Sequence, residues 1–94
     1  MDLVKDTIQI FSKDKCIYCD KAKSLLNDYN VPFKEIKLSN LDKLKEITNG
    51  HNTFPFVFFG DEFIGGYTEL RHSMLTDMPQ KLISIGIKIK LDDF

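Results

Sequence analysis

The sequence lacks the features that mark several large classes of protein. It has 94 residues, no tryptophan and only two cysteines, Cys16 and Cys19. Small secreted domains that depend on disulfides carry several bridges, and a pair separated by two residues closes too short a loop to constrain the unfolded chain much. No apolar stretch reaches the roughly 20 residues that a membrane-spanning helix needs. We therefore expect no membrane partner and no structural staple.

An excess of charge of one sign is also missing. Lys and Arg total 13, Asp and Glu total 14, and the formal net charge is −1. This balance gives no broad attraction to nucleic acid, so we expect no nucleic-acid partner. The segment MDLVKDTIQIF has no basic stretch followed by an apolar signal core. We expect a cytoplasmic monomer in which residues 1–94 form a single domain, with 43% hydrophobic residues to build its core.

Hydrophobic periodicity and turn residues predict an α/β fold. Strands are expected at 7–12, 32–38, 54–60 and 63–66, and the last two form a hairpin. Helices are expected at 18–29, with its apolar face on Tyr18, Ala22, Leu25, Leu26 and Tyr29, at about 41–48, and from Thr68 and Pro79 onward. The order βαβ followed by ββα predicts a sheet of about four strands with helices on its faces. The tail, residues 87–94, fits an edge strand, a helix extension or a frayed end.

Both cysteines lie where the first predicted strand meets the first predicted helix, in KCIYC. Free backbone N–H groups and the positive end of the helix dipole favour the thiolate of Cys16. Cys19, one turn further along, has the position to attack a mixed disulfide held by Cys16, the second step of thiol–disulfide exchange. We interpret Cys16 as the nucleophile and Cys19 as the resolving thiol.

The cysteine pair has two other interpretations. A zinc site needs four ligands, or three and a water, and the remaining candidates, His51 and His72, have no spacing that completes a zinc pattern, so no metal is expected. Two buried and inert cysteines are the other alternative. Lysines on both sides of the pair argue against burial.

Three motifs occur in order: FSKDKCIYC, TFPFVFFG and GGYTEL. Together they resemble the glutaredoxin family of the dithiol, Cys-x-x-Cys type, over Thr7 to Ile85. The resemblance implies a thioredoxin-like fold, a four-stranded mixed sheet flanked by helices, with a cis peptide bond before Pro55. It also implies glutathione as co-substrate and no permanently bound cofactor.

The resemblance further implies a glutathione site. Lys13 would pair with the glycyl carboxylate, the backbone of Phe54 would hold the cysteinyl unit, and Glu69 would meet the ammonium group. The γ-glutamyl carboxylate would lie at the helix start at Thr68, where Gly65 and Gly66 let the backbone approach. The full set is Lys13, Tyr18, Thr53, Phe54, Pro55, Gly66, Tyr67, Thr68 and Glu69.

Some positions depart from the family's pattern. Ile17 stands where relatives often have Pro, Ser or Val, and Glu69 stands where they usually have Asp. His51 and Asn52 precede Thr53, where relatives often carry Arg or Gln. A neutral imidazole binds a carboxylate less well than a guanidinium, so weaker glutathione binding is expected.

The leading hypothesis is a glutathione-dependent thiol–disulfide oxidoreductase that reduces protein disulfides and glutathione mixed disulfides. One alternative is a redoxin reduced by thioredoxin reductase that donates electrons to ribonucleotide reductase. Another is a binding module that holds a [2Fe–2S] cluster between two chains, with Cys16 and glutathione thiols as ligands.

Overall fold

The computed structural model describes residues 7–89. Its four-stranded sheet has the order β2-β1-β3-β4. The strands are β1 (Ile8–Ser12), β2 (Phe33–Lys37), β3 (Phe56–Phe59) and β4 (Glu62–Gly65). Because β1 is parallel to β2 and antiparallel to β3, and β3 is antiparallel to β4, the sheet is mixed. The predicted strands and the predicted hairpin are confirmed.

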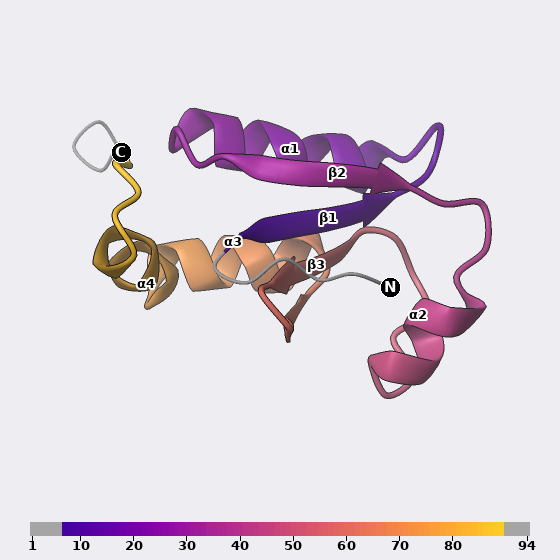
Figure 1. Ribbon diagram of the computed structural model, residues 1–94. Helices are drawn as coiled ribbons and strands as arrows, with labels where there is room; N and C mark the ends of the chain where they lie inside the picture. Colours follow the sequence, from indigo (N-terminus) through magenta and orange to yellow (C-terminus); the bar gives the residue numbers. More distant parts are fainter. Residues whose placement is uncertain (1–6, 90–94) are drawn as a thin grey trace.

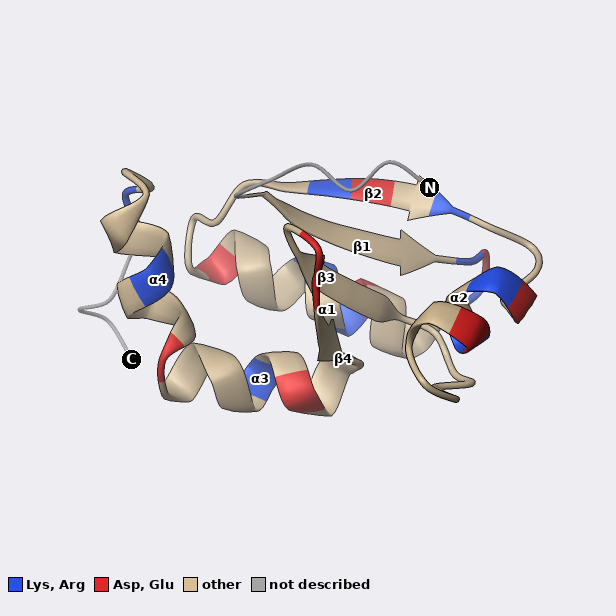
Figure 2. Ribbon diagram, turned by 60° about the horizontal axis from the view of Figure 1, so that its bottom comes forward, with Lys and Arg blue, Asp and Glu red and all other residues tan. Residues whose placement is uncertain are grey.

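The helices within residues 7–89 are α1 (Ile17–Asp28), α2 (Asp42–Ile47), α3 (Tyr67–Leu75) and α4 (Met78–Ser84). Figure 1 shows α1 and α3 against the sheet, with α2 beyond the end toward which β1 and β2 point. Blue and red segments are interspersed along β2, α2 and α3 (Figure 2). Within residues 7–89, no helix combines the length and apolar character needed to cross a membrane.

Side chains point to alternate faces along the strands, which divides the core into two layers. Ile8 and Ile10 of β1 pack with an aliphatic cluster formed largely by α1, α3 and α4, whereas Phe11 joins a second cluster with Leu44 of α2. The second cluster is mostly phenylalanine: Phe11, Phe56 and Phe58, with Phe54 and Phe63 against it. All five residues of β1 are buried, polar ones included, because this central strand is covered on both faces.

The helix α1 begins directly after Cys16 and buries Cys19, Ala22 and Leu26. It ends near Asn30, whose φ of +59° is a left-handed conformation typical of the residue that follows a helix. Tyr18 belongs to the predicted apolar face and is 56% exposed, which leaves its ring free to line a groove beside the cysteines. It lies on the edge of the face, one position before Cys19, which takes the buried site.

The third helix starts earlier than predicted. Thr68 was expected to cap it, but the helix begins at Tyr67 and its N-cap residue is Gly66. The Glu69 carboxylate accepts a hydrogen bond from the Gly66 N–H at 2.7 Å, which satisfies a backbone donor two residues before Thr68. Thr68 is therefore the second residue of the helix.

The last helix begins as expected, with Pro79 as its second residue. Residues 87–89 of the tail form neither strand nor helix, and Ile87 and Ile89 pack against the aliphatic cluster. The rest of the predicted tail, residues 90–94, lies outside the described residues.

Candidate active site

The two cysteines form a disulfide at the N-terminal end of α1, with their Cα atoms 5.2 Å apart. Cys16 is the N-cap residue of this helix, and its Sγ accepts a hydrogen bond from the Cys19 N–H at 3.1 Å. A sulfur in this position lies where backbone donors and the helix dipole stabilise negative charge. Cys19 is 1% exposed and Cys16 is more open, so Cys16 is the more accessible of the two cysteines.

An open groove of about 560 Å³ begins beside this helix end. It is formed by the loop before β3, the end of β4 and the start of α3, with Tyr18 of α1 at its rim. The residues of the predicted set that line it are Tyr18, Thr53, Phe54, Pro55, Gly66, Tyr67, Thr68 and Glu69. The Phe54–Pro55 bond is cis, as expected. The structure thus brings together every member of that set except Lys13.

Lys13 lies beside the groove and is exposed. Its ammonium group is 5.7 Å from the centre of the Phe54 ring, close enough for a cation–π contact. Through Phe54 the side chain borders the groove and brings a positive charge to that end of it.

The start of α3 forms the opposite side of the groove. Its first backbone N–H groups have no partners within the helix, and the helix dipole makes this end positive. Gly65 has φ of +133°, and a Cβ atom added there would come within 2.5 Å of the Glu69 Cβ. Glu69, predicted to meet an ammonium group, packs over Gly65 and binds the Gly66 N–H, so the groove wall depends on it.

Aromatic rings form the rim nearest the disulfide. The rings of Tyr18 and Tyr67 lie 6.0 Å apart, and the Lys21 ammonium is 5.1 Å from the centre of the Tyr18 ring. Ile17, between Cys16 and Tyr18, is 71% exposed. A substrate that approaches Cys16 therefore meets an apolar surface with a lysine beside it.

His51 forms part of the groove floor. Its ring packs edge-on against Phe56 at 4.7 Å and Phe63 at 5.1 Å. Its Nε2 atom is buried and has no hydrogen bond to any residue within 7–89. These aromatic neighbours fix the His51 ring. The sequence indicates only that His51 stands near the position where relatives often carry Arg or Gln. His72 is exposed on α3.

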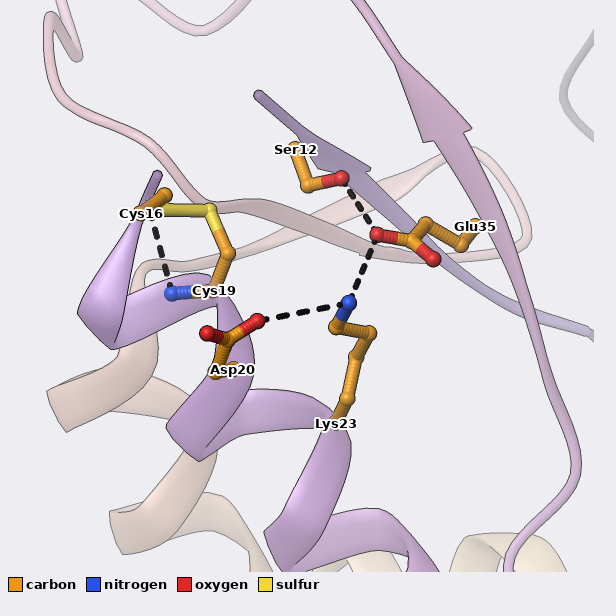
Figure 3. Close-up of a disulfide and its surroundings, with 6 residues drawn as sticks. All are labelled: Ser12, Cys16, Cys19, Asp20, Lys23 and Glu35. Carbon is orange, nitrogen blue, oxygen red and sulfur yellow. Dashed lines mark hydrogen bonds and ion pairs between the residues drawn. A yellow bond between two sulfur atoms is a disulfide. The ribbon is translucent and has the colours of Figure 1, made fainter. Parts of the chain in front are cut away.

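A polar network that the sequence did not predict lies next to the disulfide (Figure 3). Ser12 donates a hydrogen bond from its Oγ to Glu35 Oε2 at 2.6 Å, and Lys23 Nζ lies 2.9 Å from the same oxygen. Lys23 Nζ is also 3.5 Å from Asp20 Oδ1. The network therefore joins β1, β2 and α1 at the end of the sheet that carries the cysteines.

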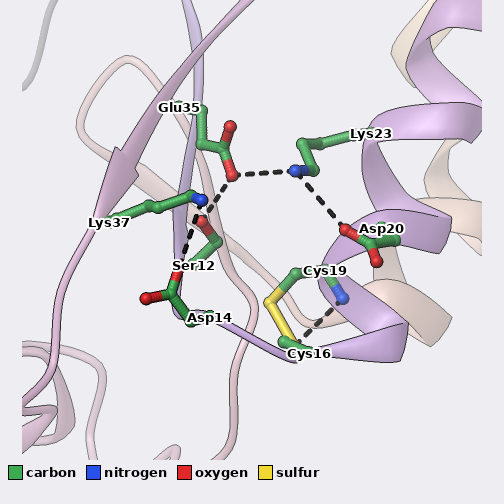
Figure 4. A network of polar contacts seen from close by, with 8 residues as sticks. All are labelled: Ser12, Asp14, Cys16, Cys19, Asp20, Lys23, Glu35 and Lys37. Carbon is green, nitrogen blue, oxygen red and sulfur yellow. Dashed lines mark hydrogen bonds and ion pairs between the residues drawn. A yellow bond between two sulfur atoms is a disulfide. The ribbon is translucent and has the colours of Figure 1, made fainter.

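Both charged groups at the centre of this network are held in their ionised forms. The hydrogen bonds from Ser12 and then from Lys23 lower the pKa of Glu35 below its ordinary value. The hydrogen bond to Glu35 raises the pKa of Lys23. Figure 4 adds a second pair, Lys37 with Asp14 at 3.2 Å, which is exposed and therefore weak.

Within the described part of the chain, no three His, Cys, Asp or Glu side chains group as ligands of a metal ion. The chemically distinctive groups of the site are thus a sulfur pair at a helix N-terminus and a groove with positive ends. This arrangement suits exchange between thiols and disulfides.

The sequence profile described as Glutaredoxin matches residues 8–64. Among curated proteins, the chain is 38% identical over 69 residues to glutaredoxin 1 of Rickettsia prowazekii, covering 68% of this chain and 73% of that protein. It is 41% identical over 69 residues to the mitochondrial glutaredoxin-2 of Bos taurus, covering 66% of this chain. It is 39% identical over 69 residues to the hybrid peroxiredoxin hyPrx5 of Haemophilus influenzae, covering 71% of this chain. The chain spans only 43% of the bovine protein and 29% of hyPrx5.

Solved structures agree with these matches. The solution structure of glutaredoxin from Brucella melitensis superposes with a TM-score of 0.67 at 30% identity, covering 93% of this chain and 96% of that one. The buckwheat glutaredoxin–glutathione complex superposes with a TM-score of 0.65 at 26% identity, covering 83% and 74%. The four-stranded mixed sheet, the Cys-x-x-Cys disulfide and the groove thus occur in a chain that belongs to the glutaredoxin family of thiol–disulfide oxidoreductases.

Proposed function

We propose that this chain reduces protein disulfides and glutathione mixed disulfides, with glutathione as its co-substrate. The observation that carries the proposal is the groove of about 560 Å³, which has Tyr18 at its rim, two residues after Cys16, and the start of α3 along its wall. Its volume lies within the range of roughly 300–1,000 Å³ that is usual for small-molecule sites. The buckwheat relative, solved with glutathione, supports this choice of ligand.

In the first step, the thiolate of Cys16 attacks one sulfur of the substrate disulfide. A bond forms between Cys16 Sγ and that sulfur, the substrate S–S bond breaks, and the other substrate sulfur leaves as a thiolate that takes a proton from solvent. The Cys19 N–H, 3.1 Å from Cys16 Sγ in the disulfide, stabilises the attacking thiolate. The exposure of Ile17 and Tyr18 leaves room for a protein substrate.

Glutathione would bind along the groove in an extended conformation. The Phe54 backbone, on the loop before β3, would pair with its central cysteinyl unit as the edge of a sheet does. The glycyl carboxylate would lie toward Lys13, and the γ-glutamyl carboxylate toward the first N–H groups of α3 at Tyr67 and Thr68. This orientation delivers the glutathione sulfur toward Cys16.

In the second step, the mixed disulfide between Cys16 and glutathione is resolved by one of two thiols. Attack by Cys19 forms the Cys16–Cys19 disulfide and releases glutathione. Attack by a second glutathione releases oxidised glutathione and leaves Cys16 as a thiolate. Two further glutathione molecules would reduce the Cys16–Cys19 disulfide, so both routes return the protein to the dithiol state.

The test is a glutathione-coupled assay of Cys16→Ser and Cys19→Ser side by side, with a glutathione mixed disulfide and a protein disulfide as substrates. Cys16→Ser should abolish both activities. Cys19→Ser should keep reduction of the mixed disulfide, since glutathione resolves it, and lose most reduction of the protein disulfide. Activity retained by Cys16→Ser would refute the proposal.

Reductant, partner and location complete the proposal. Turnover with glutathione should exceed turnover with thioredoxin reductase, and the reverse ratio would favour the alternative redoxin. Ribonucleotide reductase is a candidate protein substrate. Direct reduction of its disulfide by the purified chain would test this candidate. We propose a cytoplasmic monomer, which sedimentation of the reduced protein and cell fractionation would check.

A further inference from the structure

Cys19 presents a problem of ionisation. Its side chain is 1% exposed, and burial favours the neutral thiol over the thiolate. As a resolving group it must lose its proton when it attacks the mixed disulfide. The groups that surround Cys19 therefore determine how readily it competes with free glutathione.

Helix geometry brings one cation to the same side of α1 as Cys19. Lys23 follows Cys19 by four residues, so both side chains lie on one face of the helix. Long helical side chains lean toward the N-terminus, which directs the Lys23 ammonium back toward the turn that carries Cys19. Figures 3 and 4 show the ammonium group and the disulfide on this side of the helix from two directions.

The ammonium group is engaged from the sheet. Glu35 lies 2.9 Å from Lys23 Nζ, and Glu35 is itself anchored by the buried Ser12 hydroxyl at 2.6 Å. The side chains of Lys23 and Glu35 are 24% and 26% exposed, so solvent screens the two charges to a similar extent. Since both groups are ionised, the pair has no net charge and neither member is a ready proton acceptor.

Other charged groups near this end of α1 come from the helix itself, from the loop before it, from β2 and from α3. They are all exposed, so water and salt screen them strongly: Lys13, Asp14, Lys15, Asp20, Lys21, Lys37, Glu69 and Arg71. His51, on the loop before β3, has its ring against Phe56 and Phe63. The Lys23–Glu35 pair is thus the least screened pair of opposite charges in this region.

We propose that Glu35 is a positioning residue that acts through Lys23: it holds the ammonium group at the sheet and cancels its charge, so that Cys19 of the reduced protein stays a neutral thiol. Without Glu35, a partly buried cation would remain on the Cys19 face and would stabilise the thiolate. Without Lys23, a partly buried anion would remain and would oppose it.

This inference rests on the proposed function for its catalytic consequence. In the mixed disulfide, attack by Cys19 forms the Cys16–Cys19 bond, breaks the bond between Cys16 and glutathione, and transfers the Cys19 proton to the departing glutathione thiolate. A neutral Cys19 slows this route and leaves more of the mixed disulfide to a second glutathione. Glu35 would therefore shift the partition toward direct turnover of glutathione mixed disulfides.

The ionisation is tested in the Cys16→Ser protein, whose remaining thiol is Cys19, by following the ultraviolet absorbance of the thiolate against pH. Adding Glu35→Gln should lower the titration midpoint by about one pH unit, roughly tenfold in thiolate population at a given pH. Adding Lys23→Gln should raise it, and adding both should return it to near the starting value. Lys37→Gln, in the exposed pair with Asp14, is the matched control and should change it little.

Shifts of opposite sign distinguish charge balance from loosened packing, because loosening moves every variant toward the midpoint of free cysteine. Shifts of the same sign, no shift, or a Lys37→Gln effect as large as that of Lys23→Gln would overturn the proposal. This titration uses no glutathione, so its result stands apart from the proposed function.

The kinetic arm uses the protein with both cysteines, in which attack of reduced Cys16 on oxidised glutathione forms the mixed disulfide and releases one glutathione. Glu35→Gln should release glutathione several-fold faster than the wild type at neutral pH, and Lys23→Gln more slowly. An unchanged release rate with a shifted midpoint would overturn the catalytic part of the proposal. Failure of oxidised glutathione to form the mixed disulfide with Cys16 at all would instead count against the proposed function.

Discussion

Substitution of Gly65 by alanine should destabilise the fold at the groove wall. The φ of +133° at Gly65 is unfavourable for any residue with a Cβ, at a cost of about 1–3 kcal/mol. In Gly65→Ala the new Cβ would also come within 2.5 Å of the Glu69 Cβ and 2.8 Å of its Oε1. The side chain of Glu69 must then move, and its hydrogen bond to the Gly66 N–H is lost.

The two costs can be added. Loss of a helix cap is worth about 0.5–2 kcal/mol, so the free energy of unfolding should fall by about 1.5–5 kcal/mol, with a central value of about 3 kcal/mol. For a domain of this size each kcal/mol corresponds to about 4–8 °C, so a loss of about 3 kcal/mol predicts a fall in Tm of roughly 12–24 °C. Thermal unfolding followed by circular dichroism, with reduced and oxidised protein measured separately, gives the number directly.

Gly50 and Gly86 supply matched controls. Their φ values are +98° and +93°, but a Cβ at either position would have no atom within 4 Å. Gly50→Ala and Gly86→Ala therefore report the backbone cost alone, and Gly65→Ala should exceed them by the value of the cap, about 0.5–2 kcal/mol. Equal destabilisation by all three variants would refute the steric reasoning.

Glu69→Ala tests the same contact from the other side. If Gly65→Ala acts partly by displacing the Glu69 carboxylate, the two substitutions remove one shared hydrogen bond. The double variant should then lose less free energy of unfolding than the sum of the two single losses. Full additivity would mean that the cap survives in Gly65→Ala. Because the start of α3 forms a groove wall, both variants should also raise KM for a glutathione mixed disulfide.

Further predictions concern acid stability, the core and the groove edge. The folded pKa of Glu35 is lowered, so its stabilisation is complete above its unfolded value of about 4.3 and is lost as pH falls through the folded value. The stability difference between wild type and Glu35→Gln, measured by urea unfolding, should therefore shrink below about pH 4; a difference that grows in acid would contradict this sign. Leu26→Ala, at a fully buried site of the aliphatic cluster, should cost about 2–5 kcal/mol in the same assay, and a loss under 1 kcal/mol would place that side chain outside the core. Lys13→Gln should raise KM for a glutathione mixed disulfide about two- to fivefold with kcat unchanged, the value of an exposed ion pair; exposed Lys34→Gln is the control, and an equal effect there would show only a change in overall charge.

The order of the elements followed from the sequence because each has a local signal. The alternation in residues 7–12, the left-handed Asn30 and the Pro at the start of α4 all depend on neighbours along the chain. The groove residues and the cis bond before Pro55 came from resemblance to a family. Spacing alone could not have supplied them, since X–Pro bonds are usually trans.

The start of α3 and the polar network were missed for different physical reasons. Thr68 has the side chain of a good cap, but a glutamate three residues after Gly66 reaches back and satisfies its N–H instead. The contact between Ser12 and Glu35 depends on the parallel register that pairs Ile10 with Glu35, and this register is a property of the assembled sheet. No pattern of neighbouring residues in the sequence predicts this register.

Within the described residues, the order β2-β1-β3-β4 puts β2 and β4 at the edges of the sheet, and both discourage pairing with another molecule. The outer strand β2 carries Lys34, Glu35 and Lys37 among its five residues, and charge along an outer strand opposes intermolecular association. On the other side, β4 is only four residues long, and its ladder with β3 is irregular between Val57 and Phe58. Within residues 7–89, the phenylalanine-rich segment most prone to aggregation is thus enclosed between neighbours, away from any flat template for fibril growth.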